Sequence, residues 1–323
     1  MNKPPIVSVI IPALNAAEWI GETLQSVLMQ SFREIEVIVV DGGSTDGTQS
    51  ITKAFGKSVK LICKLHSGKS ASRNAGIYAA QGEYIAFIDA DDLWLPEKLE
   101  LQLQMFSSDP NLGWVYSDGY LFEGKATNNI MTFGSLSHLH SGDILCPLLL
   151  NDFIPSPTPV IRRKIIDKIG YFDETLQRHE PEDWDMWLRI AAHYPIGFVN
   201  RSLVRYRLHP SSLMAREGVL DALDGRVSII ERAVNRNPDR LGRLKNRSVV
   251  NCYVAAGNCY SLSGELSKAR SMYLQAIKLA PMQNKAYVHF VFSVIGKHTI
   301  YKAVRLRYKL RYKLSNFINS LRS

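Results

Sequence analysis

The first hundred residues alternate short apolar runs with helical patterns, and this alternation most constrains the fold. The apolar runs span residues 6–12, 35–41, 59–63 and 84–88, and helical spacing fills 17–30 and 71–81. Continuous apolar strands separated by helices are typical of a parallel sheet that is covered on both faces. In such a sheet, ligands bind beyond the carboxyl ends of the strands. We therefore expect the polar residues that follow the four runs to meet at one edge.

The charge of the chain is unevenly distributed. The 323 residues carry a net charge of +9, with 46% hydrophobic and 21% charged residues, which is the balance of a globular protein. Eight basic residues and no acidic residue lie in 297–323, so the first 296 residues are nearly neutral. A nucleic-acid-binding protein is expected to have a basic body. We therefore expect no nucleic-acid partner.

The basic tail, residues 297–323, predicts an amphipathic helix. Its apolar side chains form one stripe, and most of its lysines and arginines lie on the opposite side. Such a helix suits anionic lipid headgroups. An edge strand, favoured by the alternation in 305–314, and a solvated helix packed on the preceding helices both remain open.

The four cysteines lack paired metal spacing and no signal-peptide pattern starts the chain, so we expect a cytoplasmic protein, peripheral at the inner face of the cell membrane.

Three regions are expected along the chain. Residues 1–217 hold the strand–helix pattern, 218–296 are helical, and 297–323 form the basic tail. Within the helical region, residues from about 250 to 283 resemble one tetratricopeptide unit, which is a pair of antiparallel helices packed through small residues. The residues that carry this resemblance are Gly257, Tyr260, Gly264, Ala269, Tyr273, Ala276 and Pro281. A single unit must bury its face against a neighbour or a partner.

Two acidic clusters are candidates for chemistry. Asp89, Asp91 and Asp92 follow an apolar run, and buried carboxylates so close together would repel each other. A Mg²⁺ or Mn²⁺ ion relieves that repulsion, although a solvated turn before a helix also fits. The second cluster, residues 180–185, precedes a helix and contains a candidate general base. Acids that complement a helix macrodipole are the alternative there.

Two further segments supply cations. Arg207 and His209 follow a strand-like run; arginine pairs well with diphosphate, and histidine is a frequent metal ligand. Lys69 and Arg73 lie at a strand-to-helix turn, where helix amides favour anions. Gly68 precedes Lys69, but the glycine spacing of a Walker loop is absent. The sequence therefore does not indicate an ATPase.

These pieces occur together and in a fixed order. The segments are 8–15 (SVIIPALN), 39–48 (VVDGGSTDGT), 71–76 (ASRNAG), 87–92 (FIDADD), 182–185 (EDWD) and 206–209 (YRLH). Over residues 6–212 the chain resembles the family 2 glycosyltransferases. The resemblance implies an α/β GT-A fold, which is Rossmann-like with a mixed, mostly parallel sheet between helices, followed here by an all-α region. It also implies inversion of the anomeric centre and a nucleotide-sugar donor, most often a UDP-sugar.

The resemblance assigns roles residue by residue. The nucleotide-sugar is contacted by Ala13, Asn15, Glu18, Asp41, Lys69, Arg73 and Asp89. The metal, Mn²⁺ or Mg²⁺, is held by Asp91, with Asp89 nearer the ribose and His209 contacting the metal or the diphosphate. Gly42 stands where many members have a second acid, while Asp41 is retained.

The resemblance makes Asp183 the general base, with Glu182 as the alternative. A base is needed because the acceptor hydroxyl has a high pKa, and one inverting displacement requires no covalent nucleophile. The implied activity is sugar transfer to a glycan or lipid-linked acceptor in cell-surface polysaccharide synthesis. The competing interpretation is an inactive, transferase-like scaffold that recruits partners through its helical repeat. The presence of both Asp91 and Asp183 favours the enzyme.

Overall fold

One sheet organises the chain. The computed structural model describes residues 4–64, 68–124, 129–209, 218–282 and 284–295. Within them, nine strands form a sheet in the order β3-β2-β1-β4-β8-β6-β9-β5, and β7 pairs with β6. The strands are β1 (Val7–Ala13), β2 (Ile35–Asp41), β3 (Lys60–Cys63), β4 (Tyr84–Phe87), β5 (Leu93–Trp94), β6 (Trp114–Glu123), β7 (Asn129–Thr132), β8 (Val160–Arg162) and β9 (Ile196–Leu208).

The sheet is parallel where the sequence predicts it and mixed beyond that point. β1 runs parallel to β2 and β4, and β2 runs parallel to β3. β8 is antiparallel to β4 and β6, whereas β6 and β9 are parallel. Because β1, β2 and β4 share one direction, their carboxyl ends meet at the same edge of the sheet.

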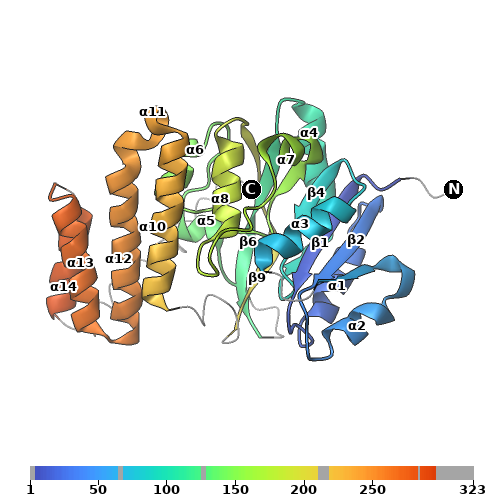
Figure 1. The fold of residues 1–323 in the computed structure, drawn as a ribbon, viewed down its shortest axis with the longest axis horizontal. Helices are drawn as coiled ribbons and strands as arrows, with labels where there is room; N and C mark the ends of the chain where they lie inside the picture. The colour runs from blue at the N-terminus through green and yellow to red at the C-terminus, as the bar shows by residue number, and fades with distance from the viewer. Residues whose placement is uncertain (1–3, 65–67, 125–128, 210–217, 283, 296–323) are drawn as a thin grey trace, which may run out of the picture.

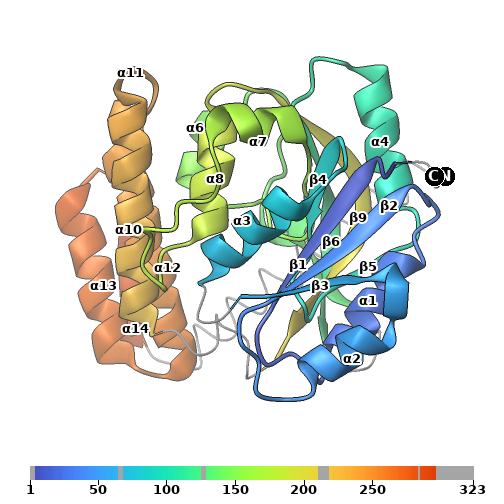
Figure 2. The same ribbon diagram turned by 45° about the vertical axis from the view of Figure 1, so that its right-hand side comes forward.

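Both faces of the sheet are covered, which explains the continuous apolar runs. In β1, Val9 and Ile11 belong to one core and Ile10 to the other, as expected when successive side chains alternate between the faces. The first core is packed by α1 (Ile20–Leu28), α2 (Thr48–Ala54) and α4 (Lys98–Ser108). The second is packed by α3 (Lys69–Ala79), α6 (Leu145–Leu150), α7 (Arg163–Ile169) and α8 (Glu182–Ala191) (Figure 2). A short helix, α5 (Phe133–Leu136), follows β7.

The C-terminal region is helical and stands beside α8. Its helices are α10 (Val219–Arg236), α11 (Pro238–Leu241), α12 (Lys245–Ser263), α13 (Leu266–Leu279) and α14 (Asn284–Ile295). α10 lies nearest to α8, and α12 and α13 follow outward (Figure 1). Ile229, Ile230 and Ala233 of α10 are buried in the same core as Trp184 and Trp187 of α8. The first helix after residue 217 is therefore packed into the sheet's own core.

α12 and α13 form a tight helical hairpin. Gly264 ends α12 with a φ of 86°, a left-handed conformation that glycine adopts without strain. The Tyr273 ring lies against Gly257, where a Cβ atom would be 2.3 Å from the ring. Ala269 and Ala276 are fully buried in the contact with α12 and α14. This packing is compatible with the tetratricopeptide interpretation, which stays a prediction.

Two features bear on the expected contact with a membrane: the basic tail and the apolarity of the helices. The basic tail, residues 297–323, lies outside the described residues. Among the helices that are described, none has the length and apolarity that crossing a membrane requires.

Candidate active site

The loops that follow β1 and β2 are joined at the carboxyl edge of the sheet. The Asn15 side-chain oxygen accepts a hydrogen bond from the Thr45 amide (2.9 Å), and the Asn15 amide donates to the Ser44 hydroxyl (2.8 Å). Asn15 has a φ of 50°, which asparagine tolerates better than most residues. Ala13 is buried at the end of β1, and Glu18 is exposed beyond it. The structure thus brings these sequence-predicted residues to one rim.

Asp41 ends β2 and offers one carboxylate oxygen to a ligand. Its Oδ1 atom accepts hydrogen bonds from the amides of Gly43 (3.1 Å) and Ser44 (3.0 Å) and from Nε2 of Gln49 (2.8 Å). Its buried Oδ2 atom has no partner within the described parts of the chain. Burial alone would raise the pKa of Asp41, but the hydrogen bonds from Ser44 and Gln49 lower it below its ordinary value. Asp41 is therefore an anionic acceptor at neutral pH.

Arg73 of α3 links three segments that are distant in the sequence. Its side chain is 2% exposed; it pairs with Glu182 and, through NH2, with Asp89 Oδ1 (3.0 Å) and Ser156 Oγ (2.9 Å). Lys69, one turn earlier, is exposed and lies 3.9 Å from Glu182. Both terminal nitrogens of Arg73 thus have protein partners, which makes this residue the connection between the two acidic clusters. A contact between Arg73 and a nucleotide stays a prediction.

The three acids of the first cluster have three different environments. Asp89 faces Arg73, whereas Asp91 Oδ2 lies 2.9 Å from His209 Nε2. Asp92 is buried, and its Oδ1 accepts a hydrogen bond from the Arg207 amide (2.9 Å). Burial, together with the charges of Asp91 and Asp89, raises the pKa of Asp92 well above its ordinary value. Asp92 is therefore a structural group, while Asp89 and Asp91 face the rim.

Arg207 is a buried hydrogen-bond partner of the first acidic cluster, residues 89–92. Its side chain is fully buried; Nε donates to the Asp91 carbonyl oxygen (2.7 Å) and NH2 pairs with Glu22 (2.7 Å). The guanidinium also lies 4.3 Å from the centre of the Trp19 ring. The sequence alone makes Arg207 a candidate to pair with diphosphate, because arginine pairs well with that group. No local sequence pattern indicates its structural role, because Arg207 lies 116 positions from Asp91 and 185 positions from Glu22 in the sequence.

Asp91 and His209 provide suitable donors for a divalent cation. A carboxylate oxygen suits Mg²⁺ and Mn²⁺, and an imidazole nitrogen suits transition metals. Their donor atoms lie 2.9 Å apart, and both side chains are partly accessible. No set of three or more such side chains is gathered into a metal site in the part of the chain that the structure describes. A cation here would complete its coordination with substrate or water oxygens, as Mg²⁺ commonly does.

The second cluster separates one carboxylate from its neighbours. Glu182 pairs with Arg73, and the fully buried Asp185 pairs with Arg189 (2.9 Å) and Arg236 (2.6 Å). Asp183 Oδ1 accepts a hydrogen bond from the amide of the next residue (2.8 Å), and no described lysine or arginine lies within 4 Å of its carboxylate. The three acids at the start of α8 therefore differ sharply in charge compensation.

Asp183 lacks a direct ion pair among the described residues, and the more distant charges of Arg73 and Lys69 only partly offset the effect of its burial. Burial, with the negative charges of Glu182 and Asp152 nearby, raises the pKa of Asp183 to about 7. Burial would also raise the pKa of Glu182, but Arg73 lowers it below its ordinary value. A group with a pKa near the working pH suits proton abstraction, and Asp183 is better suited than Glu182. The macrodipole alternative also holds in part, because all three acids lie in the first turn of α8.

Fold and site together define an α/β protein with acidic groups at the carboxyl edge of its sheet. The sequence model of glycosyl transferase family 2 matches residues 8–170, about half of the chain. The chain belongs to this family.

Curated relatives extend the similarity over most of the sheet. An uncharacterized glycosyltransferase of Rickettsia typhi is 31% identical over 208 residues, which cover 64% of each chain. The Escherichia coli protein WfaP, named UDP-Glc:alpha-D-GlcNAc-diphosphoundecaprenol beta-1,3-glucosyltransferase, is 29% identical over 219 residues, 66% of this chain and 81% of WfaP. The chain spans 64% or less of the length of the Rickettsia relatives, and only about a third of the longer ones.

Solved structures share the fold at low identity. S. aureus TarS 1-349 in complex with UDP-GlcNAc aligns with a TM-score of 0.60 and 19% identity, over 94% of this chain and 91% of TarS 1-349. The mannosyltransferase PcManGT of Pyrobaculum calidifontis, in complex with GDP-Man and Mn²⁺, aligns with a TM-score of 0.63 and 18% identity, over 98% of this chain and 88% of PcManGT. The expected GT-A fold with an all-helical C-terminal region is thereby confirmed.

Proposed function

We propose that the chain is a metal-dependent, inverting glycosyltransferase that moves a sugar from a UDP-sugar to an acceptor hydroxyl in cell-surface glycan synthesis. The observation that carries the proposal is the isolation of Asp183. This carboxylate has a pKa of about 7 and no cation within 4 Å among the described residues, beside a network that connects Arg73, Asp89 and Glu182. Glu182 is committed to Arg73, which supports Asp183 as the base.

The donor would lie along the rim formed by Ala13, Asn15, Glu18, Asp41, Lys69 and Asp89. Asp41 supports this placement, because its Oδ2 atom is a buried acceptor without a partner in the described chain and suits an N–H donor of a nucleobase. WfaP is named for a UDP-Glc donor, and TarS was solved with UDP-GlcNAc. These two proteins support a UDP-sugar donor, whereas PcManGT was solved with GDP-Man.

Asp91 and His209 would hold a Mn²⁺ or Mg²⁺ ion, with Asp89 nearer the ribose. PcManGT was solved with Mn²⁺, which supports a divalent cation in this fold. When bound, such an ion offsets the negative charge of the diphosphate leaving group. The exposed Lys69 adds a positive charge at the same edge, 3.9 Å from Glu182.

The base acts on the opposite side of the sugar from the leaving group. The Asp183 carboxylate accepts the proton of the acceptor hydroxyl as that oxygen bonds to the anomeric carbon. The bond from the anomeric carbon to the diphosphate oxygen breaks in the same displacement, so the configuration inverts. WfaP is named for a diphosphoundecaprenol-linked acceptor. A glycan or lipid-linked acceptor is therefore the class we propose.

The basic tail, residues 297–323, would place the enzyme at the inner membrane face, where lipid-linked acceptors are available. Vesicle flotation of the full chain and of a chain ending at residue 296 tests this role. We expect the full chain to bind anionic vesicles and the shortened chain to remain unbound. Equal binding of the two chains would exclude the tail as the anchor.

The test of the activity is UDP release from a panel of UDP-sugars with Mn²⁺, for the native chain and for Asp183→Asn. We expect turnover of at least one sugar by the native chain and its loss in the variant, with UDP binding retained. Absence of both binding and turnover across the panel would favour the inactive scaffold that recruits partners through its helical repeat.

A further inference from the structure

α10 is the first helix of the C-terminal region, and it contacts the acidic segment 180–185 directly. The contact is close because Gly225 has no side chain: a Cβ atom there would lie 2.1 Å from the His179 carbonyl oxygen and 3.1 Å from the Glu180 Cα atom. The helix axis can approach the main chain that leads into α8 only at such a residue. This approach lets short side chains of α10 reach the acids.

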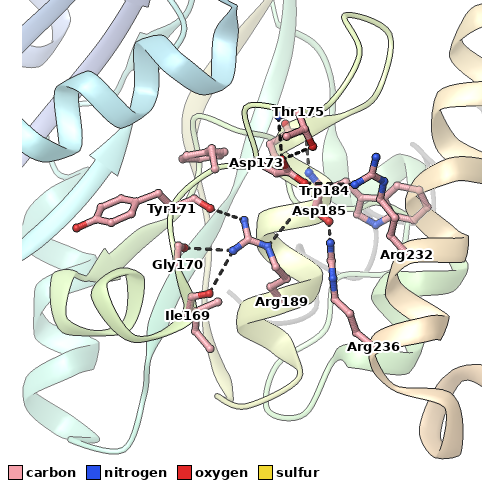
Figure 3. A network of polar contacts seen from close by, with 12 residues as sticks. Ile169, Gly170, Tyr171, Asp173, Thr175, Trp184, Asp185, Arg189, Arg232 and Arg236 are labelled. Atoms are coloured by element: carbon pink, nitrogen blue, oxygen red, sulfur yellow. Dashed lines mark hydrogen bonds and ion pairs between the residues drawn. The ribbon is translucent and has the colours of Figure 1, made fainter.

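Polar side chains of α10 then pair with two carboxylates, Glu180 and Asp185, that flank Asp183 in the sequence. Ser228 donates a hydrogen bond to Glu180, and Arg232 lies 3.8 Å from the same carboxylate. Arg236 pairs with Asp185 (2.6 Å), which Arg189 contacts from within α8 (Figure 3). Arg232 also pairs with Asp173 (3.3 Å) in the segment before α8.

A further pair reaches the surroundings of Asp183 from α10. Arg226 lies 3.5 Å from Asp152, which follows α6, and its guanidinium is 5.4 Å from the centre of the Trp184 ring. Asp152 is one of two carboxylates whose negative charge acts on Asp183. Arg226 therefore compensates a charge that faces the proposed base.

We infer that α10 is a positioning element of the active site: it neutralises the carboxylates around Asp183, with Arg226 acting through Asp152, and so leaves Asp183 as the available base. The inference rests on the proposed function. It gives the helical region a role in the reaction in addition to its packing in the core. Arg226 is a positioning residue, since among the described residues it contacts Asp152 and Trp184 and not Asp183 itself.

The pH profile of the reaction distinguishes this role from a structural one. The charged and titratable groups that face Asp183 are Asp152, Glu182, Arg73, Lys69 and Tyr206. Removing the Arg226 charge leaves Asp152 uncompensated beside Asp183, so the two carboxylates lose their protons at higher pH. Removing the Asp152 charge has the opposite effect. Loss of packing alone would move neither midpoint in a defined direction.

The experiment measures UDP release from UDP-glucose and UDP-N-acetylglucosamine, with Mn²⁺, between pH 5 and 9. We expect Arg226→Met to raise the acid-limb midpoint by roughly half to one pH unit, and Asp152→Asn to lower it. Arg226→Lys should keep the native midpoint, and the double variant should return close to it. The matched control is Arg201→Met, which removes an exposed ion pair with Glu97 (2.6 Å) in another part of the molecule.

The outcomes separate the two proposals. A native chain that releases no UDP from these two sugars or from any other UDP-sugar of the panel contradicts the proposed function and the inference with it. An active native chain whose midpoint is the same in Arg226→Met, Asp152→Asn and Arg201→Met overturns the inference alone. Thermal unfolding of each variant shows that it is folded; Arg226 is 39% exposed, so its replacement is compatible with folding.

Discussion

The carbonyl oxygen of His179 occupies the space where a side chain on Gly225 would begin, 2.1 Å from the position of its Cβ atom. A mid-helix glycine normally costs stability relative to alanine. Here we expect the reverse, because Gly225→Ala must push α10 away from the segment that leads into α8. Overpacking of this kind costs about 1–3 kcal/mol. Chemical denaturation should show a lower free energy of unfolding, and UDP release should fall as the acidic segment shifts.

Gly242→Ala is the control for this prediction. Apart from its own chain neighbours, no atom of the described residues lies within 4 Å of the place a Cβ atom would take on Gly242, and its φ of −52° is helical. We expect that variant to be neutral or slightly more stable. Equal stability of the two variants would show that α10 is free to move away from residue 179 without cost.

The two acids at the start of α8 should respond differently to substitution. Asp183→Asn removes the proposed base, and we expect UDP release to slow about 10²–10⁴-fold with little change in unfolding temperature. Glu182→Gln removes the main partner of Arg73, whose side chain is 2% exposed, so we expect a marked loss of stability. Kinetics and thermal unfolding on the same samples compare the two. If Glu182→Gln were instead the stable but inactive variant, Glu182 would be the base and Asp183 the structural acid.

The acidity of Asp183 sets the pH dependence of the reaction. A base must be deprotonated to accept a proton, so activity should fall as the pH drops below about 7, the pKa of Asp183. The logarithm of kcat/KM should decline with a slope near 1 on that side. A profile that stays flat down to pH 5 would contradict Asp183 as the base.

Metal dependence should trace to Asp91 and His209. Removing divalent ions with a chelator should abolish UDP release, and Mn²⁺ should restore it. Calorimetry in the presence of UDP should show weaker Mn²⁺ binding for Asp91→Asn than for His209→Ala, because the carboxylate supplies charge as well as a donor atom. Asp239→Asn, on an exposed residue of α11, is the control. Activity of the native chain in excess chelator would remove the proposed role of Asp91.

Much of the architecture follows from local sequence. The apolar runs that predict β1 to β4 agree with the structure to within one or two residues at each end, since a strand buried on both faces must be apolar throughout. The carboxyl edge and its acids follow from the shared strand direction. The resemblance assigned roles to Asp41, Asp91 and Asp183; the structure gives each of them a different environment, and the roles stay predictions.

The remaining features depend on pairs that no local pattern reveals. Arg73 donates a hydrogen bond to Ser156, which lies 83 residues away in the sequence. Arg226 of α10 pairs with Asp152, which follows α6. Gly225 looks unfavourable within a helix until the neighbouring main chain is in place. For the same reason the sequence separates 218–296 from the transferase region, whereas α10 is packed into the core of that region.

Lys98 supports a last prediction, on stability. The Lys98 side chain is fully buried, donates a hydrogen bond to Gln102 Oε1 (2.7 Å) and lies 4.0 Å from the centre of the Trp94 ring. Burial lowers the pKa of Lys98 well below the ordinary lysine value of about 10.4. The unfolded chain therefore binds a proton more tightly than the folded one, so stability should rise as the pH approaches that ordinary value. Lys98→Met should flatten this slope in denaturation measured from pH 7 to 10. Lys53→Met, at an exposed position of α2, should keep it, and an unchanged slope in Lys98→Met would show that Lys98 is charged in the core.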